Sequence, residues 1–502
     1  MNRVLRTFPA LAAVIVVAFL EKTASAQFAQ VTAEADVVLT RGPVHEAFAS
    51  TVLFDPEPGV VVTRTPPPPI EELPPDQRPE GSNITWIPGY FSWDDEQNDF
   101  IWVSGVWRAL PPHRQWVSGY WARTGHGHQW VSGYWADADV SEIEYLPEPP
   151  ETVEAGPNIE APSADQTWVP GSWTWHHGHY AWRPGYWAPV YSDWSWVPGH
   201  YIWTPRGYVF VDGYWDHVIA NRGVLFAPVR FDSGIYARAG FSYSPRTVID
   251  LAVFSDHLFV RPQYHHYYFG DYYSPSYYDV GFFPSFSFHI GHHGYDPIYA
   301  HERWHHRHDH DWHRHREAAY RHRREHEHAR PPRTLAAQLV LSADSEKSRE
   351  GSFRLATTLD RLAKEGDRTV RLQPLDKDAR QKLADRRVEF QKSREERQVL
   401  EAGPSSASRE SGPVKLKITK SSVKSAPDGE VSRHRSPPKR QEAPQPDLKV
   451  EPKPRKAGVN RVPQSKEARP DERRDRERPS SESSQQPPTK SKKKSKDDKD
   501  DR

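Results

Sequence analysis

The sequence predicts a mainly β protein, and three observations lead to this prediction. Seventeen of the 19 Trp residues lie between Trp86 and Trp215. Thirteen of these 17 fall within a hexapeptide, aromatic-x-x-Gly-x-aromatic, that recurs eight times, mostly at intervals of 14 residues. Aromatic residues also alternate around the hexapeptides, as at Phe91 and Trp93, and a period of two is that of a β-strand. We therefore expect two antiparallel four-stranded aromatic β-meander modules, extra strands, a His-rich helix, short charged helices and a disordered C-terminal tail.

Composition supports a chain that is folded in only part of its length. The 502 residues include 67 basic and 67 acidic side chains, 26 His, 47 Pro and no Cys. Only 36% are hydrophobic, whereas roughly 45–50% is typical of a chain folded throughout. The absence of Cys excludes a disulfide framework, a cysteine nucleophile and a Cys-ligated metal site.

The first 26 residues have the features of a secretory signal peptide. Arg3 and Arg6 precede an apolar run from Leu11 to Leu20, and small residues then form an A-x-A cleavage site between Ala26 and Gln27. The apolar run is about half of the roughly 20 residues that a membrane-spanning helix needs. An uncleaved anchor is the alternative. We expect export to the periplasm, the cell surface or the medium, with no transmembrane span after signal removal.

Pro- and Glu-rich stretches divide the chain into modules. One such stretch precedes the first four hexapeptides and a second separates them from the last four, so we expect both to be linkers. Val224–Phe226, Val248–Leu251 and Leu258–Val260 look like further strands, expected to pack on the second module. The predicted organisation is an N-terminal segment and linker (27–82), the first Trp-repeat module (83–136), a linker (137–165), the second Trp-repeat module (166–216), a β/aromatic extension (217–288), a His-rich helix (289–332), a charged helical region (333–402) and the disordered tail (403–502).

Each repeat has the length of one strand and one turn. Turn-like segments such as Asp94–Asn98 separate the hexapeptides, so we expect the chain to reverse there. The Gly is expected to form a β-bulge, for which it can adopt a positive φ. The alternative places the tip of a hairpin at the Gly. The structural repeat residues are Trp86, Gly89, Trp102, Gly105, Trp107, Trp116, Gly119, Trp121, Trp130, Gly133, Trp135, Trp168, Gly171, Trp173, Trp182, Gly185, Trp187, Trp196, Gly199, Gly213 and Trp215.

The hexapeptide resembles the motif W-x-x-G-x-W or Y-x-W-G-x-W of bacterial exported Trp-rich repeat proteins. The resemblance covers residues 86–215, about a quarter of the chain. The residue before the second aromatic is Tyr, Val, Ser or His here, so the match is loose at that position. The resemblance implies an exported protein, and it implies no activity.

A helix with a high density of His follows the repeats. Asp296-Pro297 is a typical helix start and Pro331-Pro332 a typical stop, so we expect one helix between them. On it, His301, His305 and His308 share a face and could bind Zn or Ni weakly. A solvated polar helix without metal is the alternative. The string from His301 to His305 also matches H-E-x-x-H, but its charged flanks leave no face for a protease core, so we expect no catalysis.

The predicted tail has no aromatic residue and carries a net charge of +11, so it cannot bury enough apolar surface to fold. It could contact an anionic polymer, although the composition favours a solvated tail with no fixed partner.

The patterns together predict a non-enzymatic structural or interaction protein of the bacterial cell envelope, without catalytic residues or a resident cofactor. One alternative is a module that binds glycans or envelope polymers through exposed Trp and Tyr. Another is a His-rich periplasmic metal-binding protein. The expected partner is an envelope polysaccharide or other anionic polymer, and nucleic acid is not expected because the chain is exported.

Overall fold

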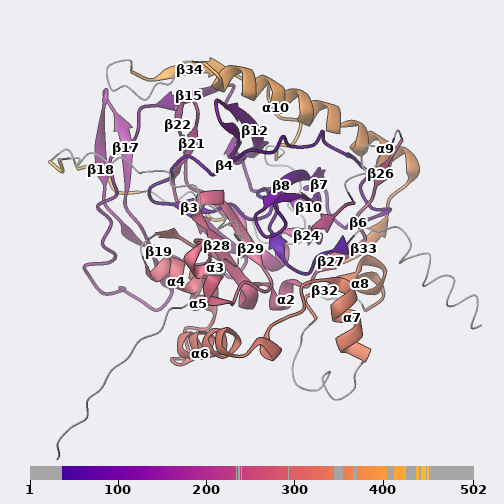
Figure 1. Cartoon of the computed structure of the whole chain (residues 1–502). Helices are drawn as coiled ribbons and strands as arrows, with labels where there is room; N and C mark the ends of the chain where they lie inside the picture. Colours follow the sequence, from indigo (N-terminus) through magenta and orange to yellow (C-terminus); the bar gives the residue numbers. More distant parts are fainter. Residues whose placement is uncertain are drawn as a thin grey trace, which may run out of the picture. The chain divides into compact units, whose positions relative to one another are not determined.

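The computed structural model describes residues 37–451 apart from 233–234, 236–237, 239, 292, 344–353, 366–369, 404–411, 426–436, 440–442 and 448. The predicted signal peptide, with its cleavage site between Ala26 and Gln27, lies outside the described residues, as do residues 452–502 of the predicted tail. The described residues are mainly β, as predicted, and form many small sheets of two to four strands (Figure 1).

The repeats pair two by two, so that each pair of consecutive copies forms one long hairpin. In the first hairpin, the outer strands β7 and β10 pair with Ile87 opposite Val106, and the inner strands β8 and β9 pair with Tyr90 opposite Val103. Two residues on each strand separate the inner and outer ladders, so neither strand contains the extra residue of a bulge. The four hairpins are β7 (Ile84–Ile87) to β10 (Val106–Ala109) through β8 (Tyr90–Asp94) and β9 (Asp99–Val103); β11 (Arg114–Val117) to β14 (Tyr134–Asp137) through β12 (Tyr120–Thr124) and β13 (Gly127–Val131); β16 (Gln166–Val169) to β19 (Tyr186–Pro189) through β17 (Ser172–His176) and β18 (His179–Arg183); and β20 (Trp194–Val197) to β23 (Tyr214–His217) through β21 (His200–Thr204) and β22 (Gly207–Val211).

The chain reverses at the segments between the hexapeptides, as predicted, and the alternative of a hairpin tip at the Gly is wrong. Each predicted module of four strands is thus a pair of hairpins. The antiparallel pairing places aromatic residues opposite one another, for example Trp86 opposite Trp107 and Phe91 opposite Trp102. The rings of these pairs lie edge to face with centroids 5.3 and 5.0 Å apart, an arrangement that adds about 0.5–1.5 kcal/mol per pair beyond burial.

The glycines of the repeat are needed for close packing rather than for a special backbone conformation. All eight are described and none has a positive φ, so the prediction of a bulge with positive φ is wrong. A Cβ atom at Gly105 would lie 2.5 Å from Trp86 Cζ2, and one at Gly133 would lie 2.5 Å from Trp116 Cζ2. The first aromatic ring of one copy therefore covers the Gly of the other copy in each hairpin, and any side chain there would displace it.

The first hairpin carries the strands that follow the repeats. β24 pairs with β10 and β25 pairs with β9. The prediction that these strands of the β/aromatic extension pack on the second module is therefore wrong, because they pair with the first module. The reason is that the outward edges of β9 and β10 are still available for pairing. The second and fourth hairpins bind strands in the same way, β4 on β13 and β15 on β22. The N-terminal strands are β1 (Val37–Val38), β2 (Gly42–Pro43), β3 (Val52–Leu53), β4 (Val61–Val62), β5 (Glu71–Glu72) and β6 (Gln77–Pro79). β15 (Glu142–Leu146) lies between the second and third hairpins in the sequence.

The remaining strands build small sheets around the extension. β28 pairs with β29 and β30, and β2 from the N-terminal segment completes this sheet. The strand-like runs predicted from Val224, Val248 and Leu258 are confirmed. The later strands are β24 (Gly223–Leu225), β25 (Val229–Arg230), β26 (Ser242–Tyr243), β27 (Thr247–Ile249), β28 (Leu258–Arg261), β29 (His266–Phe269), β30 (Phe283–Pro284), β31 (Gly294–Tyr295), β32 (Ala356–Thr358), β33 (Leu372–Pro374) and β34 (Val414–Lys417).

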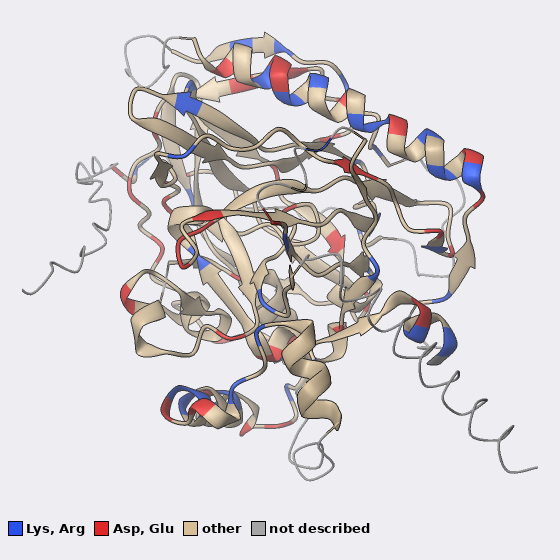
Figure 2. Ribbon diagram, turned by 45° about the vertical axis from the view of Figure 1, so that its right-hand side comes forward, with Lys and Arg blue, Asp and Glu red and all other residues tan. Residues whose placement is uncertain are grey.

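Helices lie mainly in the last third of the described chain. The longest, α10, contacts β12 (Figure 1), and Figure 2 shows basic and acidic residues alternating along it, whereas the strands carry few charges. Among the described residues, no helix combines the length and the apolarity needed to cross a membrane. The α-helices are α2 (Leu251–Phe254), α3 (Pro275–Asp279), α4 (Ser285–Ile290), α5 (Pro297–His305), α6 (Trp312–Glu325), α7 (Leu335–Ala343), α8 (Leu359–Glu365), α9 (Lys377–Asp385) and α10 (Arg387–Glu401).

Part of the predicted disordered tail is folded onto the repeats. β34 pairs with β15, and Val423 is buried in the main core. Further on, the backbone carbonyl of Lys439 accepts a hydrogen bond from Trp215 Nε1 at 3.1 Å. Composition failed here because a short β-strand needs only an exposed strand edge, and not a core of its own, to become ordered.

Candidate functional site

The repeat Trp residues are mainly core residues, which limits where a ligand could contact them. Twelve of the 19 Trp side chains are buried. The other seven are half-buried, and four of these seven line one cleft. The buried residues are Trp86, Trp93, Trp102, Trp107, Trp116, Trp130, Trp135, Trp173, Trp182, Trp194, Trp196 and Trp215.

Three of the four hairpins bind a glutamate carboxylate where their ladder is interrupted. In the first hairpin, Glu72 Oε1 accepts hydrogen bonds from Trp102 Nε1 and the Gly105 amide, both at 2.9 Å, and Glu72 Oε2 accepts one from the Gly89 amide at 2.7 Å. We call this arrangement, an indole N–H and the amide of the Gly three residues later on one carboxylate, the W-x-x-G clamp. It satisfies amides that the interrupted ladder leaves without a partner.

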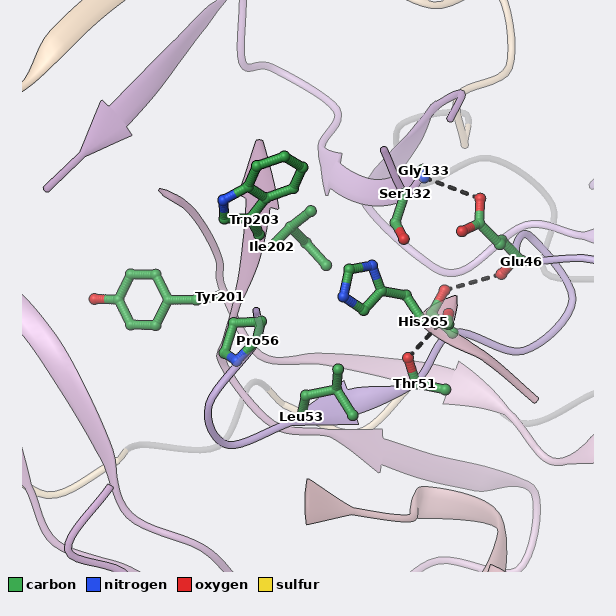
Figure 3. Close-up of a pocket in the computed structure, with 11 residues that line it drawn as sticks. Glu46, Thr51, Leu53, Pro56, Ser132, Gly133, Tyr201, Ile202, Trp203 and His265 are labelled. Atoms are coloured by element: carbon green, nitrogen blue, oxygen red, sulfur yellow. Dashed lines mark hydrogen bonds between the residues drawn. The ribbon is translucent and has the colours of Figure 1, made fainter. Parts of the chain in front are cut away.

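The second and third hairpins repeat the clamp. Glu46 accepts from Trp130 Nε1 at 2.8 Å and from the Gly133 amide at 3.0 Å, and Figure 3 shows the Glu46–Gly133 bond at the edge of a small pocket. Glu154 accepts from Trp168 Nε1 at 2.9 Å and from the Gly171 amide at 2.5 Å. The Trp and Gly of the motif therefore act together as a carboxylate receptor inside the protein.

Burial strongly affects the first of these carboxylates. Glu72 is 2% exposed, and burial raises its pKa to about 7, against the three N–H donors, which favour the ionised form. Glu72 thus titrates near neutral pH.

Sequence reasoning missed the clamp glutamates because they lie in segments that it treated as linkers. Glu72 and Glu154 each lie 17 residues before the first Gly of their module, Gly89 and Gly171. That shared offset is a second internal repeat, and it could have identified Glu72 and Glu154 from the sequence. Glu46 has no counterpart at this offset, so only the structure reveals it.

The four half-buried Trp that lie together border a cleft of about 590 Å³. Its walls are the linker before β16, the third hairpin, and the chain from α4 to the start of α6. Trp168 and Trp187 form an edge-to-face pair with centroids 5.5 Å apart on the hairpin side. The Trp and Tyr rings of the cleft are Trp168, Trp187, Tyr295, Trp304 and Trp312.

The opposite wall of the cleft carries two arginines and one carboxylate, that of Asp309. Arg303 and Arg307 line it, and the Arg307 guanidinium lies 4.5 Å from the centroid of Trp304. Arg307 also pairs with Asp165, Nε to Oδ1, at 3.2 Å. The buried Nε1 of Trp304 has no hydrogen-bond partner in the described part of the chain. The cleft thus offers aromatic faces and cationic groups to a ligand, whereas the Trp304 Nε1 donor is buried away from it.

The predicted His-rich helix is two helices. The Asp296 side chain caps α5, accepting from the amides of Ile298 and Tyr299, as the sequence suggests. The prediction of one continuous helix is wrong, because α5 ends at His305 and α6 begins at Trp312. Between them the chain folds back, so that Trp312 stacks on His306 at 5.1 Å between centroids.

The three His residues predicted to bind metal are not assembled into a site. The rings of His301 and His305 stack with centroids 6.5 Å apart, and His301 Nε2 lies 3.2 Å from the Tyr191 carbonyl oxygen. Burial lowers the pKa of His301 to about 4. Among the described residues, no three His, Asp or Glu side chains are grouped so that they could hold a metal ion. The break in the helix instead brings His306, His310 and His313 to the cleft wall.

The family comparison agrees with the hairpin organisation. The model of the WXXGXW repeat, which spans two copies, matches residues 81–108, 116–136, 164–188 and 192–216. Each match coincides with one of the four hairpins, so two copies are the structural unit. No curated protein sequence and no solved structure matches the chain.

Proposed function

We propose that this chain, whose residues 81–216 carry WXXGXW repeats, is an exported, non-enzymatic interaction protein of the bacterial cell envelope. In this proposal the repeat hairpins are the scaffold, and the aromatic cleft beside the third hairpin binds an acidic envelope polysaccharide. The observation that carries the proposal is that four of the seven half-buried Trp side chains line this one cleft.

The aromatic rings supply the surface that a sugar ring requires. The volume of about 590 Å³ lies within the range of roughly 300–1,000 Å³ found for ligand sites. Trp and Tyr present broad apolar faces together with a polar edge, which suits a ligand that has both C–H faces and hydroxyl groups. The twelve buried Trp lie in the hairpins and support the scaffold rather than a ligand.

The charged residues of the cleft favour an acidic ligand. Arg303 is exposed on α5, and Arg307 and three His residues follow it along the same wall. Guanidinium groups bind carboxylates in a bidentate manner. Two carboxylates also line the cleft, those of Asp309 and Glu154, and the Glu154 carboxylate is engaged by Trp168 and Gly171. A uronic-acid polymer would therefore find both stacking surfaces and cationic partners.

Export and the lack of an enzymatic role are parts of the same proposal. The signal-peptide features of residues 1–26 support export. His301 of the H-E-x-x-H string lies against the Tyr191 carbonyl, and Glu302 lies 3.8 Å from His306 Nε2, which supports a structural role for the string. The proposed function requires no cofactor.

Retention on immobilised polygalacturonate, compared with neutral dextran, tests the binding. We expect the full mature chain to bind the uronate polymer in a salt-sensitive manner, because exposed charges are screened over about 8 Å at 0.15 M salt. The double variant R303E/R307E should bind at least tenfold more weakly. R321E, on the exposed part of α6 outside the cleft, is the matched control and should bind normally. Equal binding to dextran, or normal binding by the double variant, would refute the proposed ligand.

Export is tested separately by sequencing the N-terminus of the protein recovered from a bacterial periplasm. We expect it to begin at Gln27. A protein that stays in the cytoplasm with residues 1–26 attached would contradict this part of the proposal.

A further inference from the structure

We propose that the fourth hairpin contains a carboxylate-binding site, formed by Trp196 Nε1 and the amide of Gly199, that takes a glutamate side chain of an acidic peptide segment. This inference rests on the clamps of the other three hairpins and is independent of the proposed function of the cleft.

The three occupied clamps share one geometry. In each, the first Trp of a hexapeptide and the Gly three residues later donate to one glutamate. The glutamate comes from outside the hairpin, at separations of 14 to 87 residues. The clamp thus depends on the hairpin's own donors, whereas the acceptor is supplied by another segment.

The fourth hairpin has the same donors. Trp196 and Gly199 occupy the positions of Trp168 and Gly171 in the third hairpin, and Gly199 and Gly213 face one another across the interruption, since a Cβ at Gly213 would lie 3.2 Å from the Gly199 amide nitrogen. The second copy begins with Phe210, whose side chain has no N–H group, so Trp196 is the indole donor of this hairpin.

The acceptor is absent among the described residues. Trp196 is 7% exposed, and its buried Nε1 has no hydrogen-bond partner there. A buried donor without an acceptor costs about 1–3 kcal/mol. In each of the other three hairpins one indole meets a glutamate, although the first hairpin still leaves Trp86 Nε1 without a partner in the described part of the chain. At the first hexapeptide position the fourth hairpin has only Trp196 as such a donor and, among the described residues, has no filled clamp there, so the structure assigns the same class of partner to Trp196.

A cavity lies at this position. It measures about 40 Å³ and is lined by Trp196, Gly199 and Gly213. A water molecule needs roughly 10–15 Å³ by the same measure, so the cavity has room for the three heavy atoms of a carboxylate. Arg183 also lines it, with Nη2 3.1 Å from the position that a Gly199 Cβ would take, and adds a positive charge. Asp212 lines the cavity too, but its carboxylate does not reach Trp196 Nε1.

Two sources could supply the glutamate. Ala443 lines the cavity, and the residue before it in the sequence is Glu442, which lies outside the described residues. The other source is a glutamate of a separate acidic peptide. The chemistry is the same in both cases, and the experiment distinguishes them.

The test follows the indole N–H resonances of the full mature chain labelled with ¹⁵N at Trp. W196F and W86F identify the two signals of interest. The probe is N-acetyl-glutamate N-methylamide, and the matched glutamine compound is the neutral comparison. Trp86 is the internal control, because its Nε1 is also buried without a partner but the carboxylate of its hairpin is already supplied by Glu72.

Saturable movement of the Trp196 signal in the wild type, with the glutamate compound only, means that the ligand is a separate peptide. Glu442 is the ligand if two results occur together. The Trp196 signal of the wild type does not respond to the probe, and in the E442Q variant that signal is shifted and then responds to the probe. The inference is overturned if the Trp196 signal is the same in both proteins and responds in neither, or if the Trp86 signal moves equally.

Discussion

Replacing Gly105 with Ala tests the packing that explains the Gly of the repeat. A Cβ atom at this position would lie 2.5 Å from Trp86 Cζ2, 2.6 Å from the Ile87 carbonyl oxygen and 2.7 Å from Glu72 Oε2. Two of these neighbours cannot move away easily, because Trp86 is 2% exposed and the carbonyl belongs to the backbone of the paired strand.

The expected cost follows from these contacts. Overpacking a filled core costs about 1–3 kcal/mol. Pushing the Glu72 carboxylate away weakens hydrogen bonds to a charged group, worth about 1.5–3 kcal/mol each. We therefore expect G105A to lower the free energy of unfolding by roughly 2–6 kcal/mol.

Urea-induced unfolding of the mature chain, followed by Trp fluorescence, measures this change. G125A is the matched control. Gly125 is exposed in the turn of the second hairpin, has no positive φ, and a Cβ there would meet nothing within 4 Å. Such a change is expected to alter stability by no more than about 0.5–1 kcal/mol. If G105A is as stable as G125A, the covering of Gly by indole does not explain the motif.

Three further predictions concern buried charges. Burial raises the pKa of Glu72 from 4.5 to about 7, so the folded state binds an extra proton between these pH values. The free energy of unfolding should therefore fall by roughly 3 kcal/mol as the pH rises through this window. Urea midpoints at pH 5 and pH 8 should show this fall in the wild type and a smaller one in E72Q. Arg108 donates to both oxygens of Asp216 at 2.5 and 2.7 Å, so D216N should lower the free energy of unfolding by about 3–5 kcal/mol, measured by the same unfolding curves, and a loss under 1 kcal/mol would contradict this. Buried Glu401 accepts hydrogen bonds from the Tyr120 and Tyr145 hydroxyls at 2.8 and 3.1 Å, so E401A should release α10 and make it the first site of limited proteolysis, whereas an unchanged cleavage pattern would refute that docking.

Much of the repeat region could be predicted from local sequence, because its pattern is set by neighbouring residues. The alternation around Phe91 and Trp93 gave the strands, and Asp94–Asn98 gave the turn. The pairing of two copies was also within reach, since two antiparallel hexapeptides bring both aromatic positions opposite one another in a single register, as Trp86 with Trp107 and Phe91 with Trp102. The role of the Gly could not be predicted from local sequence, because it depends on an aromatic ring from the other copy.

The segments treated as linkers show where composition stops being informative. Pro and Glu in a stretch such as 65–81 usually indicate solvated chain, and yet Glu72 is among the most buried carboxylates described. Its burial depends on Trp102 Nε1 and on the Gly89 and Gly105 amides, and no local pattern around Glu72 reveals them. The prediction of one helix over the His-rich segment was wrong for the same reason. The break before Trp312 depends on the rings that pack on the Trp312 side chain, those of Tyr299 and His306, and not on the local sequence pattern.

The clamps also explain why the repeat needs its acidic neighbours. The hairpin cannot continue its ladder at the x-Gly step, because the indole that covers each Gly occupies the space, so amides are left without a strand partner. A carboxylate can accept from two or three such donors at once, whereas a neutral amide side chain would place its own N–H group against one of them. A glutamate from a distant segment is therefore as much a part of the folded hairpin as the two Trp residues, and a hairpin without one, such as that of Trp196, is expected to acquire a carboxylate from elsewhere.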